Sequence, residues 1–350
     1  MRNLSTRRSS PLVWLVVAAA GLVAFLPSGA AAPSAEKGTL FVEMVEYKGW
    51  KNNLRLANGE VELIVTLDVG PRIISYRTLS GPNVFKEYSD QLGKSGESDW
   101  QMRGGHRLWA GPEDLTRTYA IDNSPVAYKN LGPGSVRLTQ MPDREYGIQK
   151  EIDLTLSASN SHVKVLHRIS NVGDKPTELA PWALSVMAPG GMEIIPLPPK
   201  RNHPGPPKNA RSAADYAPDQ TVILWPFFDF TDSRWKFGRR FITLCQDPTA
   251  TGPTKIGLAH RGGWVAYLNQ GNLFVKHFAF QDGKTYPDRG VNFETFTNAD
   301  MLEAESLGPI TKLNPGEKVE LTEEWELHPG VASVSSENDI ERVILPLLRK

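Results

Sequence analysis

The segment from Arg103 to Trp109 gathers side chains that could act on a small polar molecule. It reads Arg-Gly-Gly-His-Arg-Leu-Trp, so that His106, Arg107 and Trp109 closely follow a glycine pair that lets the backbone turn tightly. Arginine and histidine donate hydrogen bonds, and an indole offers an apolar face to sugar C–H groups. These groups suit a polyhydroxyl ligand. The alternative is a tight turn with a core Trp and surface arginines.

A pair of carboxylates near the end of the chain is the second candidate. If residues 301–306 form a strand, Glu303 and Glu305 share one face, because side chains alternate across a strand. They would then lie about 7 Å apart along it, which suits general-base chemistry. Glu294, in the preceding cluster of residues 292–298, is a further ligand-binding candidate. The alternative for these glutamates is a solvated acidic face.

Residues 225–237 are rich in aromatic rings and include Trp225 and Trp235. Core packing is expected for most of these rings. Either indole could instead stack on a sugar at a groove wall.

Two polar residues share strand faces with apolar neighbours. Glu323 alternates in step with Leu321 and Trp325, so its carboxylate must find a partner or shift its pKa. His167 stands in the apolar segment 163–169, and we expect it to be a core histidine with satisfied hydrogen bonds.

Composition excludes several classes of protein. The 350 residues include 39 Lys+Arg, 39 Asp+Glu and a single cysteine, Cys245. One thiol rules out an internal disulfide framework, and the balanced charge lacks the basic footprint of a nucleic-acid-binding protein. The chain has no Walker loop, no GxSxG elbow and no HExxH motif, and its histidines lack metal-ligand spacing. We therefore predict neither a cofactor nor a metal from these motifs, and a metal site could arise only by assembly of distant residues in space.

The N-terminus has the order of a signal peptide. Arg2, Arg7 and Arg8 precede an apolar run, which small residues follow. The run is shorter than the roughly 20 apolar residues of a spanning helix, the alternative reading. Cleavage after Ala30 leaves 36 basic and 39 acidic residues, a net charge of −3. We predict residues 1–30 as a signal peptide and the mature protein as periplasmic or secreted, with no membrane association.

The mature chain is patterned as strands. Apolar residues alternate with polar ones from Val61 to Val69, and similar runs recur up to residue 327 with turn-forming clusters between them. This predicts an all-β, antiparallel sandwich in a single large domain of residues 31–335. Pro196–Pro218 is expected to be an extended loop, and residues 336–350 a tail that could form a short helix.

In chain order these segments resemble the galactose mutarotase-like superfamily, the aldose 1-epimerase relatives, over residues 39–330. The resemblance is strongest to a bacterial branch designated only as a domain of unknown function. It rests on Gly70-Pro71-Arg72-Ile73, the Gly-Gly-His-Arg-Leu-Trp element, Asn171-Val172-Gly173, Tyr286-Pro287-Asp288, Leu302-Glu303-Ala304-Glu305 and Asn314-Pro315-Gly316. It implies a β-supersandwich with a sugar-binding groove on one concave sheet, and no cofactor.

The resemblance also implies roles for site residues. In aldose 1-epimerases a glutamate takes the proton of the anomeric hydroxyl and a histidine protonates the ring oxygen. The glutamate corresponds to Glu303 or Glu305, and an earlier histidine to His106. The position of the general-acid histidine holds Trp182, so His106 would have to act as the acid. Together with the residues singled out above, the candidate ligand-binding residues are Arg103, Arg107, Trp109, Trp182, Glu294 and Trp225.

Three hypotheses follow. The protein is an exported sugar-active enzyme with Glu305 or Glu303 as base and His106 as acid, or a carbohydrate-binding module without turnover, or a structural β-sandwich. The first two require His106 and the late glutamates to meet across one hollow.

Overall fold

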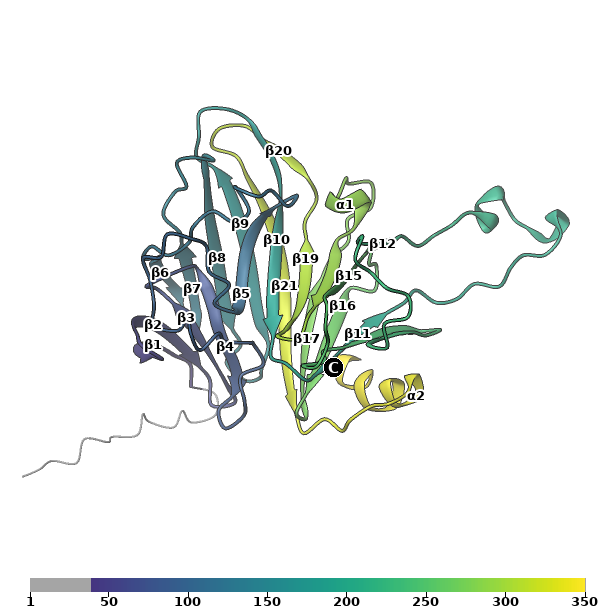
Figure 1. Cartoon of the computed structure of the whole chain (residues 1–350), viewed down its shortest axis with the longest axis horizontal. Coiled ribbons are helices and arrows are strands. Elements are labelled where there is room, and N and C mark those ends of the chain that lie inside the picture. Colours follow the sequence, from purple (N-terminus) through teal and green to yellow (C-terminus); the bar gives the residue numbers. More distant parts are fainter. Residues whose placement is uncertain (1–38, 350) are drawn as a thin grey trace, which may run out of the picture. The chain divides into compact units, whose positions relative to one another are not determined.

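Two antiparallel β-sheets packed face to face make up the protein (Figure 1). The computed structural model describes residues 39–349, so the predicted signal peptide, residues 1–30, lies outside the described residues. All strand pairings given below are antiparallel. The prediction of an all-β, antiparallel sandwich is confirmed.

The 11-stranded sheet carries most of the candidate site residues. Its strands, in spatial order, are β1 (Phe41–Tyr47), β2 (Trp50–Ala57), β3 (Val61–Thr66), β4 (Arg72–Thr78), β5 (Gly105–Gly111), β10 (Thr177–Met187), β19 (Leu302–Leu307), β18 (Phe293–Thr297), β15 (Thr254–Leu258) and β12 (Val222–Leu224), with β20 (Thr311–Leu313) also paired to β10. Three strands far apart in sequence, β5, β10 and β19, are therefore neighbours.

The 10-stranded sheet covers the other side of the core. Its order is β13 (Trp235–Phe237), β14 (Phe241–Cys245), β11 (Met192–Pro196), β16 (Trp264–Asn269), β17 (Asn272–Phe278), β21 (Lys318–Pro329), β9 (Val163–Asn171), β8 (Ile148–Leu156), β7 (Ser135–Thr139) and β6 (Ala127–Gly132). The alternation that predicts a strand over residues 148–156 matches β8, whose buried and less buried residues alternate along its length.

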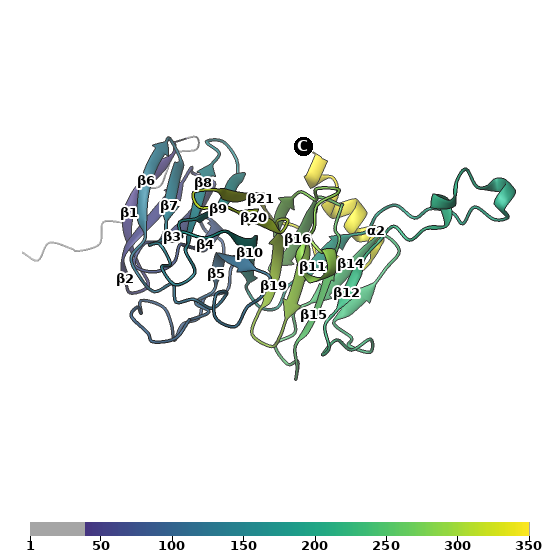
Figure 2. The same ribbon diagram turned by 90° about the horizontal axis from the view of Figure 1, so that it is seen from above.

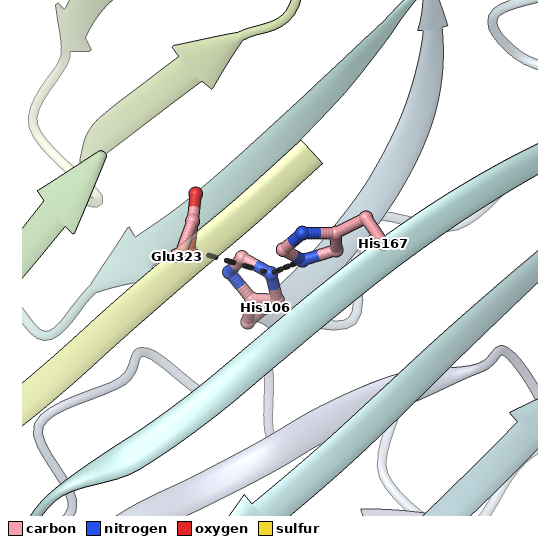
Figure 3. Close-up of side chains that lie close together, drawn as sticks. All are labelled: His106, His167 and Glu323. Atoms are coloured by element: carbon pink, nitrogen blue, oxygen red, sulfur yellow. Dashed lines mark hydrogen bonds and ion pairs between the residues drawn. The ribbon is translucent and has the colours of Figure 1, made fainter. Parts of the chain in front are cut away.

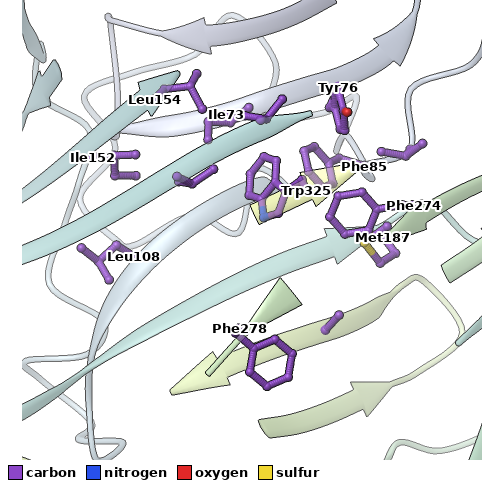
Figure 4. Close-up of a cluster of buried hydrophobic side chains, with 14 of the residues drawn as sticks. Ile73, Tyr76, Phe85, Leu108, Ile152, Leu154, Met187, Phe274, Phe278 and Trp325 are labelled. Carbon is purple, nitrogen blue, oxygen red and sulfur yellow. The ribbon is translucent and has the colours of Figure 1, made fainter. Parts of the chain in front are cut away.

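Apolar side chains from both sheets fill the space between them (Figure 4). At the centre, the ring of Trp325 lies 5.7 Å from the rings of both Phe85 and Phe274, in edge-to-face geometry. The outer face of β3 is buried as well, since Ile64 packs with Trp50 and Ile74 in a second cluster. Alternation in the sequence therefore marks two different buried environments here, not a core face and a solvent face.

Helical structure is sparse. Among residues 39–349 it consists of α1 (Pro287–Gly290), α2 (Glu337–Asp339), the π-helical turn Ile340–Ile344, and 3-10 turns at Pro207–Asn209, Ala213–Tyr216 and Leu347–Arg349. The tail that was expected to form a short helix is thus a series of different helical turns. No helix among residues 39–349 has the length and apolar character that a membrane crossing requires.

The proline-rich segment between β11 and β12 projects away from the sheets in both views (Figures 1 and 2). Apart from its two 3-10 turns it has no regular structure, and most of its residues are exposed. The prediction of an extended loop over Pro196–Pro218 is confirmed, although Pro196 itself ends β11.

Candidate functional site

Strand β5 presents different chemistry on its two faces. Arg107 and Trp109 pair in register with Leu184 and Trp182 of β10, and all four side chains lie on the open face of the 11-stranded sheet. His106 and Leu108 occupy the alternate positions, toward the 10-stranded sheet. The six-residue motif found in the sequence is therefore divided between the open face and the core.

A cavity of about 340 Å³ lies on the open face. Aromatic rings form much of its wall, from Trp109, Tyr119, Trp182, Trp225, Phe227 and Phe296. Its acidic and basic lining residues are Glu113, Lys255, Glu303 and Glu305. Aromatic faces combined with hydrogen-bonding groups are the features that recognise a molecule with both C–H faces and hydroxyl groups.

Lys255 is the central cation of this cavity. Its Nζ lies 2.7 Å from Oε2 of Glu294 and 3.2 Å from Oε2 of Glu305. The same ammonium is 5.0 Å from the ring centre of Trp182 and 4.7 Å from that of Trp225. The lysine is thus held between two carboxylates and two indoles.

Arg107 forms an ion pair with Glu303, as Lys255 does with Glu305. Its Nη2 donates a hydrogen bond of 2.7 Å to Oε1 of Glu303, and its guanidinium carbon lies 4.2 Å from the ring centre of Trp109. Both cations near the cavity are therefore already paired with carboxylates.

Glu305 is the carboxyl group best prepared for proton transfer. Burial raises its pKa to about 7, Lys255 opposes that rise, and the nearby charge of Glu303 adds to it. Burial also holds the pKa of Glu294 well above its ordinary value. Oε2 of Glu305 accepts a hydrogen bond of 2.9 Å from Trp182 Nε1, whereas its Oε1 is buried without a hydrogen-bond partner among the described residues. A group that titrates near neutral pH can either give or take a proton.

His106 does not reach this cavity. It is fully buried between the sheets, where its Nε2 lies 2.7 Å from Nε2 of His167 and its Nδ1 lies 2.9 Å from Oγ of Ser185 (Figure 3). The prediction that His106 and Glu305 meet across one hollow is wrong. The physical reason is strand parity, because adjacent residues point to opposite faces and Arg107 already occupies the open one.

The hydrogen bonds define how the two imidazoles are protonated. His167 Nδ1 donates to the carbonyl of Leu321 at 3.0 Å, since a carbonyl can only accept. If both imidazoles are neutral, His167 Nε2 accepts from His106 Nε2–H, and Ser185 donates to His106 Nδ1. Burial lowers the pKa of both histidines, which agrees with a neutral pair. The prediction of a satisfied core histidine at residue 167 is confirmed.

Glu323 lies beside this pair and is also fully bonded. It contacts Lys276 Nζ at 3.0 Å, accepts a hydrogen bond of 2.7 Å from Trp325 Nε1, and accepts another from Ser306 Oγ. Potential ligand atoms of His106, His167 and Glu323 lie within 4.8 Å of one another. Because these atoms satisfy each other or neighbouring groups, the geometry is that of a hydrogen-bonded network rather than of a metal centre.

The remaining candidate residues also divide into those that line the cavity and those that do not. Arg103 is buried beneath the loop before β5, where its Nη2 lies 2.6 Å from Oε2 of Glu97, and it does not line the cavity. This corrects the expectation that Arg103 binds ligand. Glu294 is fully buried on the open face, where it pairs with Lys255, and it does not line the cavity, which corrects its expected contact with a ligand. Trp109, Trp182 and Trp225 do line the cavity.

Sequence reasoning missed Lys255 and Tyr119. Lys255 lies in an ordinary strand, and only the pairing of β15 with β18, which places it opposite Phe296, brings it to the cavity. Tyr119 belongs to the loop after β5, and its hydroxyl donates a hydrogen bond of 2.5 Å to Glu113. The sequence feature that could have pointed to Tyr119 is its hydrogen-bond partner Glu113, which follows Trp109 by only a few residues.

Comparisons with known proteins bear on the fold. No family model matches this chain, and no curated protein matches its sequence. Solved structures do match. A galactose mutarotase-like protein from Lactobacillus casei is 10% identical, with a TM-score of 0.52 over 79% of this chain and 100% of that one.

Two further structures extend the comparison. A galactose mutarotase-like protein from Clostridium acetobutylicum is 9% identical, with a TM-score of 0.50 over 84% of this chain and 100% of that one. A TPR-domain-containing protein from Parabacteroides distasonis is 15% identical, with a TM-score of 0.52 over 81% of this chain. The chain spans about half of that protein, 49% of its length. At these identities the likeness establishes the fold, which is galactose mutarotase-like, and nothing about activity.

Proposed function

We propose that this protein binds a carbohydrate in the cavity on the open face of its 11-stranded sheet. The observation that carries the proposal is the meeting of Trp109, Trp182 and Trp225 with Glu303 and Glu305 in one cavity. Its volume of about 340 Å³ falls within the roughly 300–1,000 Å³ typical of small-molecule sites. The unpartnered Oε1 of Glu305 gives a sugar hydroxyl an acceptor.

The charges of the cavity favour a neutral sugar. Lys255 is engaged by Glu294 and Glu305, and Arg107 by Glu303. A carboxylate or phosphate on the ligand would find the lining cation, Lys255, already paired, and it would face Glu113, Glu303 and Glu305.

Binding is tested by calorimetric titration with D-galactose, D-glucose and D-mannose. We expect a saturable signal with at least one of them, and its loss in Trp182→Ala. Phe230→Ala is the matched control, because Phe230 is 80% exposed and does not line the cavity. A flat titration with every neutral sugar would leave only the structural β-sandwich.

A second candidate function is sugar ring opening of the aldose 1-epimerase type. The specific observation is Glu305, a buried carboxyl group whose pKa is about 7, beside the Arg107-bound Glu303. With His106 in the core, proton transfer would fall to these glutamates. One carboxylate would take the anomeric hydroxyl proton while the C1–O5 bond breaks, and the other carboxyl group would protonate O5.

Polarimetry of freshly dissolved α-D-glucose and α-D-galactose separates the two functions. An enzyme accelerates mutarotation and loses on the order of 10²–10⁴-fold in rate in Glu305→Gln. Sugar binding without acceleration, with no effect of this variant on the rate, would identify a binding module.

We also propose that the chain is exported, on the basis of the basic and apolar order of residues 1–30. Intact-mass measurement of the protein in the bacterial host's periplasmic fraction tests this proposal. Export with cleavage after Ala30 gives the mass of a chain that begins at residue 31.

A further inference from the structure

A buried lysine supports the strand that carries Glu303 and Glu305. Lys276, on β17 of the 10-stranded sheet, is completely buried, and its Nζ donates a hydrogen bond of 2.9 Å to the carbonyl of Ala304. Ala304 lies between the two glutamates on β19, so the bonded carbonyl belongs to the peptide that leads into Glu305. The lysine therefore contacts the back of the cavity from the opposite sheet.

Two other hydrogen bonds join this part of the 11-stranded sheet to the 10-stranded sheet. Ser306, the residue after Glu305, bonds through its hydroxyl to Glu323, which is the ion-pair partner of Lys276. His106, the residue before Arg107, bonds to His167 of the 10-stranded sheet (Figure 3). Each of these bonded residues lies next in sequence to an ionisable residue of the open face.

This network is not explained by stability alone. Burying an ion pair in a core is costly, and well-packed apolar residues of similar volume often serve stability as well or better. A hydrogen-bonded pair also controls position, because hydrogen bonds restrict the distance and angle between the groups that they join. The groups fixed here are the main chain of β19 and the side chain of Ser306.

We propose that Lys276 is a positioning residue for the cavity. Together with Glu323, Lys276 fixes the main chain of β19 and thereby sets where the carboxyl groups of Glu303 and Glu305 lie. This inference rests on the proposed carbohydrate-binding function. Nothing in it requires Lys276 to touch the ligand.

The charge of Lys276 also acts on Glu305 through the strand. Burial lowers the pKa of Lys276, while Glu323, Glu193 and Glu305 oppose that change. The attraction between Lys276 and Glu305 is mutual, so removal of the ammonium makes the ionised form of Glu305 less favourable. The pKa of Glu305 should then rise.

The test compares three proteins with the wild type. Lys276→Met removes the support but leaves Glu323 buried and unpaired, so it can fail to fold. The double variant Lys276→Met/Glu323→Gln removes both charges of the pair and keeps a hydrogen-bonding side chain beside Trp325 and Ser306. Leu154→Ala is the matched control, since Leu154 lies in the same core on β8 and makes no bond to β5, β10 or β19.

Two quantities are measured on each folded variant. One is the affinity for D-galactose, or for whichever neutral hexose binds the wild type. The other is the titration midpoint of the Glu305 carboxyl carbon by NMR. We expect the double variant to bind on the order of tenfold more weakly. The higher midpoint is expected in Lys276→Met alone, because the double variant also removes the opposing negative charge of Glu323. The control should lose thermal stability and change neither quantity.

The outcomes are distinct. A folded double variant with unchanged affinity overturns the inference, and so does a control that loses affinity as strongly. Stoichiometric zinc or another metal bound at His106, His167 and Glu323, found by elemental analysis, also overturns it. If the wild type binds no sugar, the proposed function fails, and the NMR shift of the Glu305 backbone amide then decides: a shift unchanged in the folded double variant overturns the action of Lys276 on β19.

Discussion

The two faces of β19 place ionisable groups in opposite conditions. On the core face, Ala304 and Ser306 are bonded to Lys276 and Glu323, whose own bonding groups all have partners. On the open face, Glu305 keeps one carboxylate oxygen without a partner although it is just as deeply buried. Glu305 is as deeply buried as Lys276 and Glu323, but one of its carboxylate oxygens has no hydrogen-bond partner in the part of the chain that the structure describes. The free oxygen of Glu305 lies at a cavity where a ligand could reach it, whereas Glu193, whose two carboxylate oxygens also lack hydrogen-bond partners among residues 39–349, is fully buried away from that cavity.

The largest expected effect tests the core face. Glu323→Ala leaves the Lys276 ammonium buried without its partner, which should cost about 3–5 kcal/mol in the free energy of unfolding. Urea denaturation followed by Trp fluorescence measures this loss. Glu305→Ala is the open-face counterpart and should cost much less, because Lys255 remains paired with Glu294. Equal losses for the two variants would erase the distinction between the faces.

The next effect concerns pH on the open face. The pKa of Glu305 is raised from 4.5 to about 7 by burial, so the folded state holds its proton more tightly than the unfolded state does. The stability that this proton contributes is present below pH 4.5 and is lost as the pH rises to about 7, a change of about 3 kcal/mol. Unfolding free energies measured across this range should fall less steeply in Glu305→Gln. Parallel profiles for the variant and the wild type would contradict the assignment.

The core histidines should behave in the opposite way. Burial lowers the pKa of His106 and His167, with Lys276 acting in the same direction on both, Arg107 on His106, and Glu323 opposing on His167. Their contribution is present above pH 6.5 and is lost as the pH falls below it, by about 1.4 kcal/mol per imidazole per pH unit.

Acid unfolding of the wild type and of His167→Gln between pH 7 and pH 5 checks this expectation. The variant has one fewer buried imidazole, so its stability should depend less on pH. A variant that is as acid-sensitive as the wild type would show that the pair is not the source.

The smallest expected effect is ligand selectivity. A uronate should bind at least about tenfold more weakly than the matching neutral sugar, because the cavity cations are already paired with glutamates. Competition between D-glucuronate and D-glucose measures the difference. Tighter binding of the uronate would mean that the ligand displaces Glu303 or Glu305 from its cation.

The sequence predicts the fold well because strand alternation and turn residues are local signals. The run at residues 148–156, for example, needs only its own residues to be identified as β8. Parity along single strands also predicted that Glu303 and Glu305 share a face, and that Glu323 needs a partner. These predictions hold because one strand fixes them.

The composition of the site could not be predicted in the same way. Which face of β5 meets the cavity depends on its register with β10, so the motif alone could not exclude His106. Lys255 enters only through the pairing of β15 with β18, a contact between strands with no distinctive residues. The loop that buries Arg103 against Glu97 is also irregular, and its path has no periodic signal.

The alternation of cavity and core residues along β5 and β19 constrains how this protein can change. Substitution at one position can alter ligand recognition while its neighbours keep the sheets joined. Loss or gain of a single residue within either strand would turn glutamates or arginine inward and the core partners outward, since a one-residue slip reverses every side chain. We therefore expect these two strands to diversify in residue type while keeping a fixed length, and new specificities to arise by length variation only in the surrounding loops.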